Sequence, residues 1–197
     1  MPYLFDLCGT LSPLNNTWDF IRFVYFKKNK RMLFFWRKLI SKIISIIFKK
    51  NPYKSRRLRI KLFYGGFHRE ELEKMSEEYF NLVFYPSLFK NLKKFLKNKK
   101  KVLFTASPDY PAKKIGELLG FSKKDIYSSV LEFKKSKICT GNLIWDNYLE
   151  NKARLFEKSN LNKNFIFFTN NLKEDFSLLK YSKKVYLVSR GEIKKIK

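Results

Sequence analysis

The sequence predicts an α/β protein in which a parallel sheet lies between two layers of helices, with an all-helical insertion after the first strand. Strands and helices alternate from Lys101 onward, which is typical of a parallel sheet covered on both faces. Residues 15–95 carry only helical patterns and follow a single short strand. Polar residues come directly after several predicted strands, where open α/β sheets place their ligand sites.

The N-terminal part of the chain is predicted to contain one strand and then helices. Tyr3, Leu4 and Phe5 form a short apolar strand that ends at Asp6. The pair Gly65-Gly66 and Pro86 interrupt the helical stretch, and acidic residues open one of its segments, as a helix N-terminus prefers. The predicted helices are Trp18–Lys28, Met32–Lys50, Pro52–Phe63, Arg69–Phe84 and Ser87–Lys97.

The C-terminal part is predicted to alternate strands and helices. Apolar runs predict buried strands, and the polar-apolar segments between them predict helices. Residues 134–146 have the pattern of a hairpin, with Gly141-Asn142 near its turn. The predicted strands are Val102–Phe104, Ile126–Phe133, Phe165–Phe168 and Val185–Val188, and the predicted helices are Pro111–Leu119, Leu149–Lys158 and Lys173–Tyr181.

Composition limits the chemistry and the partners. A chain of 197 residues is long enough for one domain with a sizeable core. Lys and Arg number 43 against 17 for Asp and Glu, so the net charge of +26 predicts an anionic partner. A single histidine, His68, argues against histidine-based zinc sites and against Ser-His or Cys-His catalysis.

Two cysteines, Cys8 and Cys139, do not make a disulfide framework. The N-terminus has no basic region before its apolar residues, so we expect no signal peptide. The most apolar segment, residues 32–48, is interrupted by cations and does not reach the roughly 20 apolar residues of a membrane span. We expect a cytoplasmic protein that can also lie peripherally on the inner face of the membrane.

Four polar positions follow predicted strands or begin a predicted helix: Asp6, Thr105, Lys152 and residues 170–175. Each has an ordinary structural alternative, since an Asp or Thr after a strand often caps a turn. A lysine on a helix of a lysine-rich chain usually faces solvent. Their order along the chain, at the ends of strands that lie side by side, predicts that they meet at one site.

The residues around Asp6 resemble the first motif of the haloacid dehalogenase superfamily, which is D-x-D-G-T-[LV] after an apolar strand. The segment Asp6-Leu7-Cys8-Gly9-Thr10-Leu11 departs from it at Cys8, where the motif has a second Asp. The second motif is a Ser or Thr that ends a strand. Here Thr105-Ala106-Ser107-Pro108 is similar to its form in the phosphoserine-phosphatase-like subgroup.

Two further motifs are also similar to those of this superfamily. The third, a lysine after a glycine-containing hairpin, is matched by Lys152. The fourth, an acidic pair followed by Leu-Leu, is matched by residues 168–179, with an asparagine where the first Asp is expected. The resemblance covers residues 1–14 and about 96–190.

The resemblance implies a three-layer Rossmann-like core from residues 1–14 and 96–197, with residues 15–95 as a helical, basic cap. It implies a Mg²⁺-dependent phosphatase that hydrolyses a phosphate monoester through an aspartyl-phosphate intermediate. The implied substrate is a phosphorylated small molecule, a sugar phosphate or a lipid-linked phosphate.

The site residues follow from the same resemblance. A phosphate ester resists attack by a carboxylate until its charge is neutralised, which a lysine, a hydroxyl donor and a metal ion can do. The tight loop after the nucleophile would offer backbone N–H groups to the phosphate. The implied catalytic residues are Asp6, Cys8, Thr105 and Lys152. The implied substrate-binding residues are Gly9, Thr10, Ala106 and Ser107. The implied Mg²⁺ ligands are Asp6, Cys8 through its carbonyl, Asn170, Asn171 and Asp175.

Two departures from the family pattern weaken the expected activity. A thiol at Cys8 is a poor replacement for the Asp that protonates the leaving group, and general acid–base catalysis contributes roughly 10²–10⁴-fold. Asparagine brings less charge to a metal than a carboxylate does. The alternative function is therefore a catalytically weak or inactive protein of this fold that binds an anionic membrane surface or nucleic acid.

The basic helical stretch leaves two interpretations open. Residues 20–61 contain fifteen Lys or Arg and no Asp or Glu. Within residues 32–49 a narrow polar face, formed by Lys38, Ser41, Lys42, Ser45 and Lys49, lies opposite a wide apolar one. That apolar face either packs on neighbouring helices or belongs to an interfacial membrane helix, such as the apolar insertion of phosphatidylglycerophosphatase C-type enzymes, which this segment resembles. Nucleic acid is the less favoured partner, because no nucleic-acid-binding motif is present.

Overall fold

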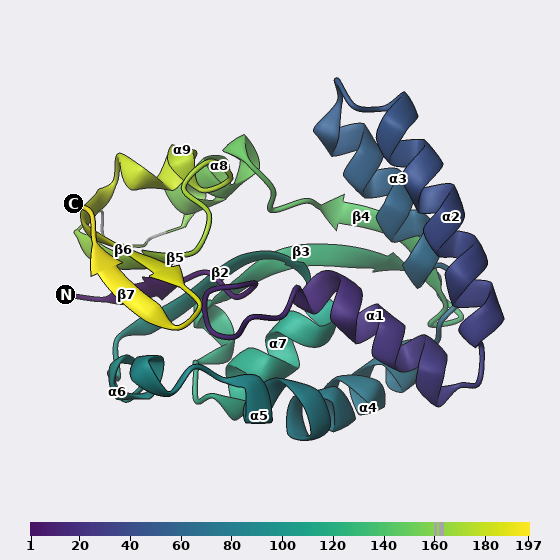
Figure 1. The fold of residues 1–197 in the computed structure, drawn as a ribbon, viewed down its shortest axis with the longest axis horizontal. Coiled ribbons are helices and arrows are strands. Elements are labelled where there is room, and N and C mark those ends of the chain that lie inside the picture. The colour runs from purple at the N-terminus through teal and green to yellow at the C-terminus, as the bar shows by residue number, and fades with distance from the viewer. Residues whose placement is uncertain (160, 162–163) are drawn as a thin grey trace.

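The computed structural model describes residues 1–159, 161 and 164–197. Within these residues seven strands form one sheet in the order β4-β3-β2-β1-β5-β6-β7 (Figure 1). The five central strands are parallel, whereas β4 and β7 run antiparallel along the two edges. The strands are β1 (Tyr3–Phe5), β2 (Lys101–Pro108), β3 (Ile126–Phe133), β4 (Cys139–Trp145), β5 (Phe165–Thr169), β6 (Ser182–Ser189) and β7 (Glu192–Lys195).

The helices fall in two groups along the chain. Between β1 and β2 come α1 (Asn16–Lys27), α2 (Arg31–Ile47), α3 (Pro52–Tyr64), α4 (Arg69–Tyr79), the π-helical turn η1 (Phe80–Phe84), α5 (Tyr85–Ser87), the 3₁₀ turn η2 (Lys90–Leu92) and α6 (Lys93–Leu96). After β2 come α7 (Asp109–Leu118), the 3₁₀ turn η3 (Lys123–Asp125), α8 (Glu150–Lys158) and α9 (Phe176–Leu179). The predicted alternation of strands and helices is confirmed.

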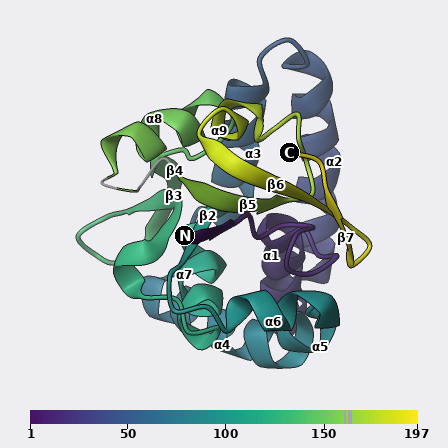
Figure 2. The ribbon, with the colours of Figure 1, turned by 90° about the vertical axis from the view of Figure 1, so that its left-hand side faces the viewer.

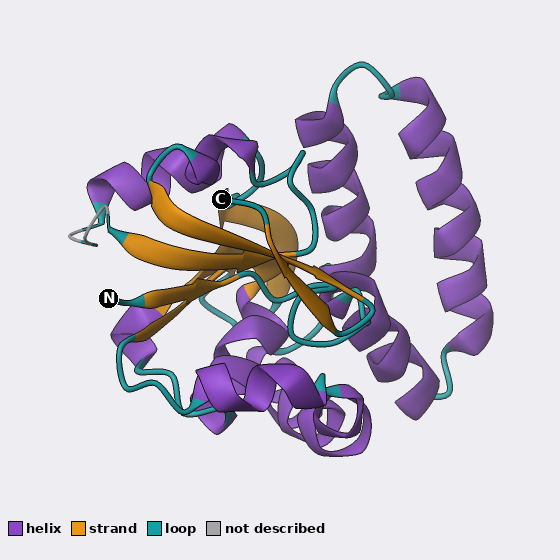
Figure 3. Cartoon of the chain, turned by 60° about the vertical axis from the view of Figure 1, so that its left-hand side comes forward, coloured by secondary structure: helices purple, strands orange, loops and turns teal. Residues whose placement is uncertain are grey.

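Helices cover both faces of the sheet (Figures 1 and 3). Successive side chains of a strand point to opposite faces, so Leu4 and Phe5 belong to two different hydrophobic clusters. Leu4 packs beneath α8 and α9 with Phe167, while Phe5 faces α7 and stacks on Phe168 with ring centroids 4.8 Å apart. Figure 2 shows the same arrangement from the side, with α8 and α9 on one face and α4 to α7 on the other. The predicted three-layer α/β core is confirmed.

The helical insertion, residues 15–95, adds no strand to the sheet beyond an isolated bridge between His68 and Ile138. Its buried residues, including Phe20 and Tyr64, lie in the same hydrophobic cluster as Phe5. The insertion and the sheet therefore share one core. The division of the chain into a core and a cap remains a prediction.

The hairpin after β3 differs from the prediction. Gly141 lies within strand β4, and the turn is at residues 134–137, where the N–H of Lys137 donates to the carbonyl of Lys134. A Cβ at Gly141 would lie 2.6 Å from the Lys61 carbonyl oxygen, and its φ is +77°. The glycine is needed because α3 packs against the strand backbone, not because the chain turns there.

Two C-terminal elements also differ. The predicted helix over residues 173–181 shortens to α9, because Asn171 begins a turn: its carbonyl accepts the N–H of Asp175 and its side chain accepts the N–H of Glu174. Strand β7 was not predicted. It pairs with β6 through a two-residue turn of Arg190 and Gly191, both in the left-handed region.

Candidate active site

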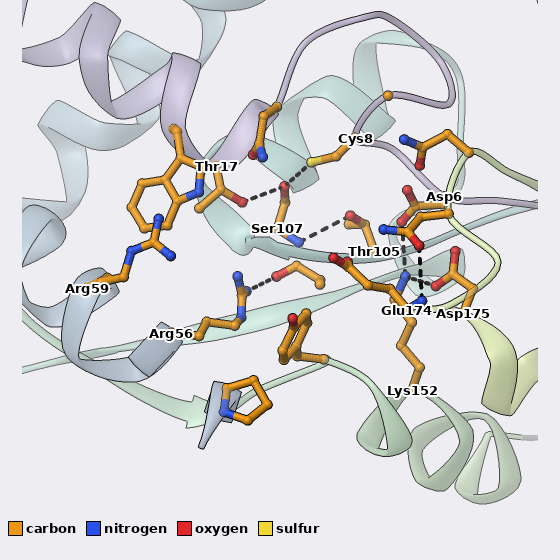
Figure 4. A pocket seen from close by; sticks show the side chains of 18 of the residues that line it. Asp6, Cys8, Thr17, Arg56, Arg59, Thr105, Ser107, Lys152, Glu174 and Asp175 are labelled. Carbon is orange, nitrogen blue, oxygen red and sulfur yellow. Dashed lines mark hydrogen bonds and ion pairs between the residues drawn. The ribbon is translucent and has the colours of Figure 1, made fainter. Parts of the chain in front are cut away.

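Asp6 lies at the carboxyl end of a central parallel strand, where open α/β sheets place their ligand sites. It follows β1, the central strand, and its backbone N–H donates to the Phe168 carbonyl at 3.0 Å. Its side chain is only 9% exposed, yet it lines a pocket of about 500 Å³. The carboxyl ends of β1, β2 and β5 surround this pocket, so the parallel topology positions the site (Figure 4).

Lys152 is brought to Asp6 from the start of α8. Its Nζ lies 3.1 Å from Asp6 Oδ1 and 2.5 Å from Asp175 Oδ1, and its side chain is 4% exposed. Asp175 is fixed by the Thr169 hydroxyl, which donates to its Oδ2 at 2.5 Å. Figure 4 shows Lys152 reaching between the two carboxylates. One buried ammonium therefore holds two carboxylates that would otherwise repel each other.

Burial controls the titration of this cluster. It raises the pKa of Asp6 from 3.8 to about 6, because desolvation outweighs the attraction of Lys152, and the charge of Asp175 raises it further. Desolvation alone would lower the pKa of Lys152, but the two carboxylates raise it well above its ordinary value. Lys152 thus stays protonated and keeps its positive charge at the site.

A chain of hydroxyls and one thiol forms the opposite wall. Thr105 Oγ1 accepts the N–H of Ser107 at 3.1 Å. Ser107 Oγ lies 3.1 Å from Cys8 Sγ and 3.1 Å from Thr17 Oγ1. These contacts join the loop after β1, the end of β2 and the start of α1 (Figure 4). Hydroxyl and thiol groups that can donate hydrogen bonds therefore line the pocket beside Asp6.

Cys8 is held as a neutral thiol. Its pKa is raised above the ordinary value of 9.0, first by burial and second by the negative charge of Asp6. The N–H groups of Asn16 and Thr17 and the Ser107 hydroxyl act in the other direction. A neutral thiol can donate a proton, but it is a weaker acid here than a free cysteine.

The loop after β1 takes a shape that depends on Gly9. Its φ is +68°, and a Cβ there would lie 2.1 Å from the Asn170 amide nitrogen. The N–H of Gly9 donates to Leu14 and that of Thr10 to Leu7, at 3.0 and 3.4 Å. The loop itself uses both N–H groups, and their contact with a phosphate stays a prediction.

The Thr10 side chain instead marks a cluster of oxygen atoms. Its hydroxyl lies 3.4 Å from Asp6 Oδ2 and 3.4 Å from Asn170 Oδ1. Carboxylate and amide oxygens are hard donors that suit Mg²⁺, which takes one or two carboxylates and completes its shell with water. The Asp6 carboxylate oxygen and the Asn170 amide oxygen therefore fit a Mg²⁺ that receives little ligand charge from the protein. Within residues 1–159, 161 and 164–197, no three His, Cys, Asp or Glu side chains cluster as a metal site.

The other two predicted ligands are engaged elsewhere. Both Asp175 oxygens are bonded, to Lys152 and Thr169. Asn171 Oδ1 accepts the N–H of Glu174 and closes the turn before α9. Asn171 and Asp175 both line the pocket, but the oxygen atoms described above are bonded to protein groups.

The last predicted substrate-binding residue, Ala106, lines the pocket through its backbone. Its carbonyl accepts hydrogen bonds from Ser129 Oγ at 2.8 Å and from the Arg56 guanidinium. Ten of the eleven sequence-predicted site residues line the pocket, and the eleventh, Thr10, is bonded to Asp6.

One wall of the pocket, which comes from the helical insertion, was not predicted from the sequence. Arg56 and Arg59 reach it from α3, and the Arg59 guanidinium lies 4.5 Å from the centre of the Trp18 ring. Arg56 is also paired with Asp146 at 3.0 Å. A spacing of three residues places both arginines on one helix face. Nothing in the sequence distinguished them from the other cations of this stretch.

The comparisons with known proteins agree with this arrangement. No protein-family model and no curated protein matches the chain. A structure of a protein of unknown function from Bordetella pertussis Tohama I matches with a TM-score of 0.66 and 17% identity, covering 84% of this chain and 80% of that one. A phosphoserine phosphohydrolase-like protein from Francisella tularensis matches with a TM-score of 0.62 and 13% identity, covering 93% and 85%.

A third solved structure is a phospho-aspartyl intermediate analogue of a phosphoserine phosphatase. It matches with a TM-score of 0.53 and 21% identity, covering 93% of this chain and 83% of that one. At these identities the likeness concerns the fold. With Asp6 after the central strand and Lys152 beside it, the chain has the haloacid dehalogenase-like fold, in the form that phosphoserine phosphatases share.

Proposed function

We propose that the protein is a Mg²⁺-dependent phosphatase that hydrolyses a phosphate monoester through an aspartyl-phosphate at Asp6. The observation that supports this most is the position of the buried Lys152 ammonium, 3.1 Å from Asp6 Oδ1. Both groups line the pocket at the carboxyl ends of the parallel strands. An accessible carboxylate next to a fixed cation is what attack on an anionic phosphate requires.

In the first step an Asp6 oxygen attacks phosphorus, and the bond between phosphorus and the ester oxygen breaks. Lys152 and the Thr105 hydroxyl stabilise the negative charge on the phosphoryl oxygens. The leaving alkoxide takes the proton of the Cys8 thiol, which is hydrogen-bonded to the Ser107 hydroxyl. Because burial raises the pKa of Cys8, this proton transfer is slow for poor leaving groups.

In the second step water attacks the phosphoaspartate, which releases inorganic phosphate and restores Asp6. The Cys8 thiolate formed in the first step takes the proton of that water. A Mg²⁺ held by Asp6 Oδ2, the Asn170 amide oxygen and the Cys8 carbonyl would neutralise charge between carboxylate and phosphate.

The insertion acts as the cap in this proposal, because α1 and α3 supply Trp18, Arg56 and Arg59 to the pocket wall. The two arginines favour a substrate whose leaving group carries negative charge or hydrogen-bond acceptors. The similar phosphoserine phosphatases make a small phosphorylated molecule the first class to test. The two free cysteines support a cytoplasmic location.

Hydrolysis of p-nitrophenyl phosphate with and without Mg²⁺ tests the proposal. Wild type should release p-nitrophenol only with Mg²⁺, and Asp6→Asn should abolish the release while leaving the circular dichroism spectrum unchanged. Asp109→Asn is the matched control, since Asp109 is equally buried but lies outside the pocket. Equal rates for wild type and Asp6→Asn would contradict the proposed nucleophile. A folded, Mg²⁺-binding wild type without turnover would favour the inactive alternative.

A further inference from the structure

Helix α2 buries only two of its residues, Phe34 and Ser41. Ser41 is buried and accepts a hydrogen bond from Arg59 Nε at 2.9 Å, and Arg37 bonds the Tyr25 hydroxyl. The polar face predicted from the sequence is thus partly turned toward α3. A surface helix of a globular protein normally buries a stripe of apolar residues, whereas α2 buries only Phe34 among its large apolar residues.

The outward side of α2 is apolar along its whole length. Nine large apolar residues of this one helix are exposed, with Met32 at 72% and Ile46 at 75%. At 3.6 residues per turn they cover an arc of about 160° centred on Ile43, and α2 forms an outer edge of the molecule (Figure 1). The nine are Met32, Leu33, Phe35, Trp36, Leu39, Ile40, Ile43, Ile46 and Ile47. We call this the outer face of α2.

Cations follow one border of the outer face. Arg31, Lys38 and Lys42 are exposed, and at 3.6 residues per turn they fall within about 40° of one another. Lys49, also exposed, follows the end of the helix. No acidic residue occurs between residues 20 and 61, so nothing neutralises this border within the helix or its flanks. An apolar arc with a cationic border is the pattern of a helix that lies in a membrane interface.

We propose that the outer face of α2 seats the protein on an anionic lipid bilayer, with the helix parallel to the surface. The apolar side chains enter the boundary between headgroups and acyl chains, and the cationic border contacts anionic headgroups. No helix in the described part of the chain is long and apolar enough to cross a membrane, and α2 has 17 residues. The contact is therefore peripheral.

Charge favours a bilayer over a second copy of the chain. The protein carries +26, and two copies joined through α2 would bring two cationic borders together. Nucleic acid would satisfy the cations but would leave nine apolar side chains against a polar surface. An anionic bilayer matches both parts of the face, since it offers hydrocarbon beneath a negative layer.

The pocket opens beside the same helix. Ser45, Phe48 and Lys49, at the end of α2, line it together with Asp6. Ser45 lies about 160° around the helix from Ile43, so α2 would lie between the bilayer and the pocket. The proposal therefore concerns the attachment of the protein to the bilayer and leaves the pocket open to the side.

Flotation with vesicles measures the contact without relying on activity. The probes are phosphatidylcholine vesicles with and without 30% phosphatidylglycerol. Wild type should float with the anionic vesicles, and 0.5 M NaCl should weaken binding. Ile43→Asn with Ile46→Asn should lower the partition coefficient by about tenfold or more. The control pair Leu118→Asn with Ile144→Asn, also exposed but outside α2, should not change it.

The cationic border is tested with Lys38→Gln and Lys42→Gln. Each lysine near an anionic leaflet contributes about 1 kcal/mol, so the double variant should bind anionic vesicles about 25-fold more weakly. Lys123→Gln with Lys124→Gln, exposed on η3, serves as the charge-matched control. Trp36 emission should shift to shorter wavelength on binding, and Trp36→Phe should remove most of that shift.

Several outcomes would overturn the proposal. One is equal flotation of wild type and the Ile43 and Ile46 double variant. Another is a wild-type dimer that the same substitutions dissociate, which would make a second copy the occupant. Vesicle binding by a protein that has no phosphatase activity would refute the proposed function and leave the membrane contact standing.

Discussion

Replacing Lys152 with methionine should destabilise the protein more than almost any other single change. The side chain is 4% exposed and its Nζ lies 3.1 Å from Asp6 and 2.5 Å from Asp175. Methionine has a similar length but no charge. The substitution therefore leaves two carboxylates close together and buried, without the cation that held them.

The expected loss follows from the cost of leaving a buried charge unpaired. Breaking a buried ion pair by removing one partner costs about 3–5 kcal/mol. A shift of about 2–4 °C in Tm per kcal/mol, for a protein of this size, converts that to about 6–20 °C. Since folded domains are stable by only about 5–15 kcal/mol, the variant should be marginal at neutral pH.

The loss should depend on pH in a known direction. Burial already raises the folded-state pKa of Asp6 to about 6, and removing Lys152 removes the largest influence that lowers it. A carboxyl whose folded pKa is raised contributes stability below its unfolded pKa, about 3.8, and that contribution is lost as pH rises through the folded pKa. The difference between variant and wild type should therefore be smallest near pH 4 and largest near pH 8.

Urea denaturation at pH 4, 6 and 8 measures these free energies of unfolding. Adding Asp175→Asn to the Lys152→Met variant should restore part of the stability, because one of the two unpaired carboxylates is gone. Lys113→Met is the control, since Lys113 is half exposed and pairs with Asp109 at 3.4 Å, so its loss should be about 0.5 kcal/mol or less. A Lys152→Met loss below about 1 kcal/mol, or one that is the same at all three pH values, would refute the reasoning.

Two more predictions concern buried acid groups. Cys8→Asp should raise turnover on alkyl phosphates by up to about 10²–10⁴-fold and on aryl phosphates by less, because only poor leaving groups need a strong acid. The control Cys8→Asn should show no gain. A folded, Mg²⁺-binding Cys8→Asp protein with unchanged turnover would count against a catalytic role at this position. Asp109→Asn should raise Tm at pH 8 but not at pH 3.5. Burial raises the pKa of Asp109, so the contribution of this carboxyl to stability is lost as pH rises. The amide oxygen of the substituted asparagine can still accept the Leu131 N–H. Thermal melts that show no gain at pH 8 would contradict the second.

The sequence by itself predicted the layered α/β core and most of its strands and helices. Apolar runs such as Phe165–Phe168 can only be buried in a sheet covered on both sides, so their pattern indicates the fold directly. It also predicted that Asp6, Thr105 and Lys152 would meet. The reason is topological: residues at the carboxyl ends of neighbouring parallel strands share one edge whatever the details of packing.

Only the tertiary structure decided which surfaces face each other. Gly141 has the local signal of a turn, yet it lies in a strand because α3 needs its missing side chain for close approach. Arg56 and Arg59 belong to the pocket because α3 leans over the sheet, and no local pattern separates them from neighbouring cations. The two faces of α2 are visible in the sequence, but which one points outward depends on the hydrogen bond between Ser41 and Arg59 and on what α1 and α3 leave uncovered. Local patterns report the preferences of a segment, whereas the partner of each face is set by contacts between residues far apart in the chain.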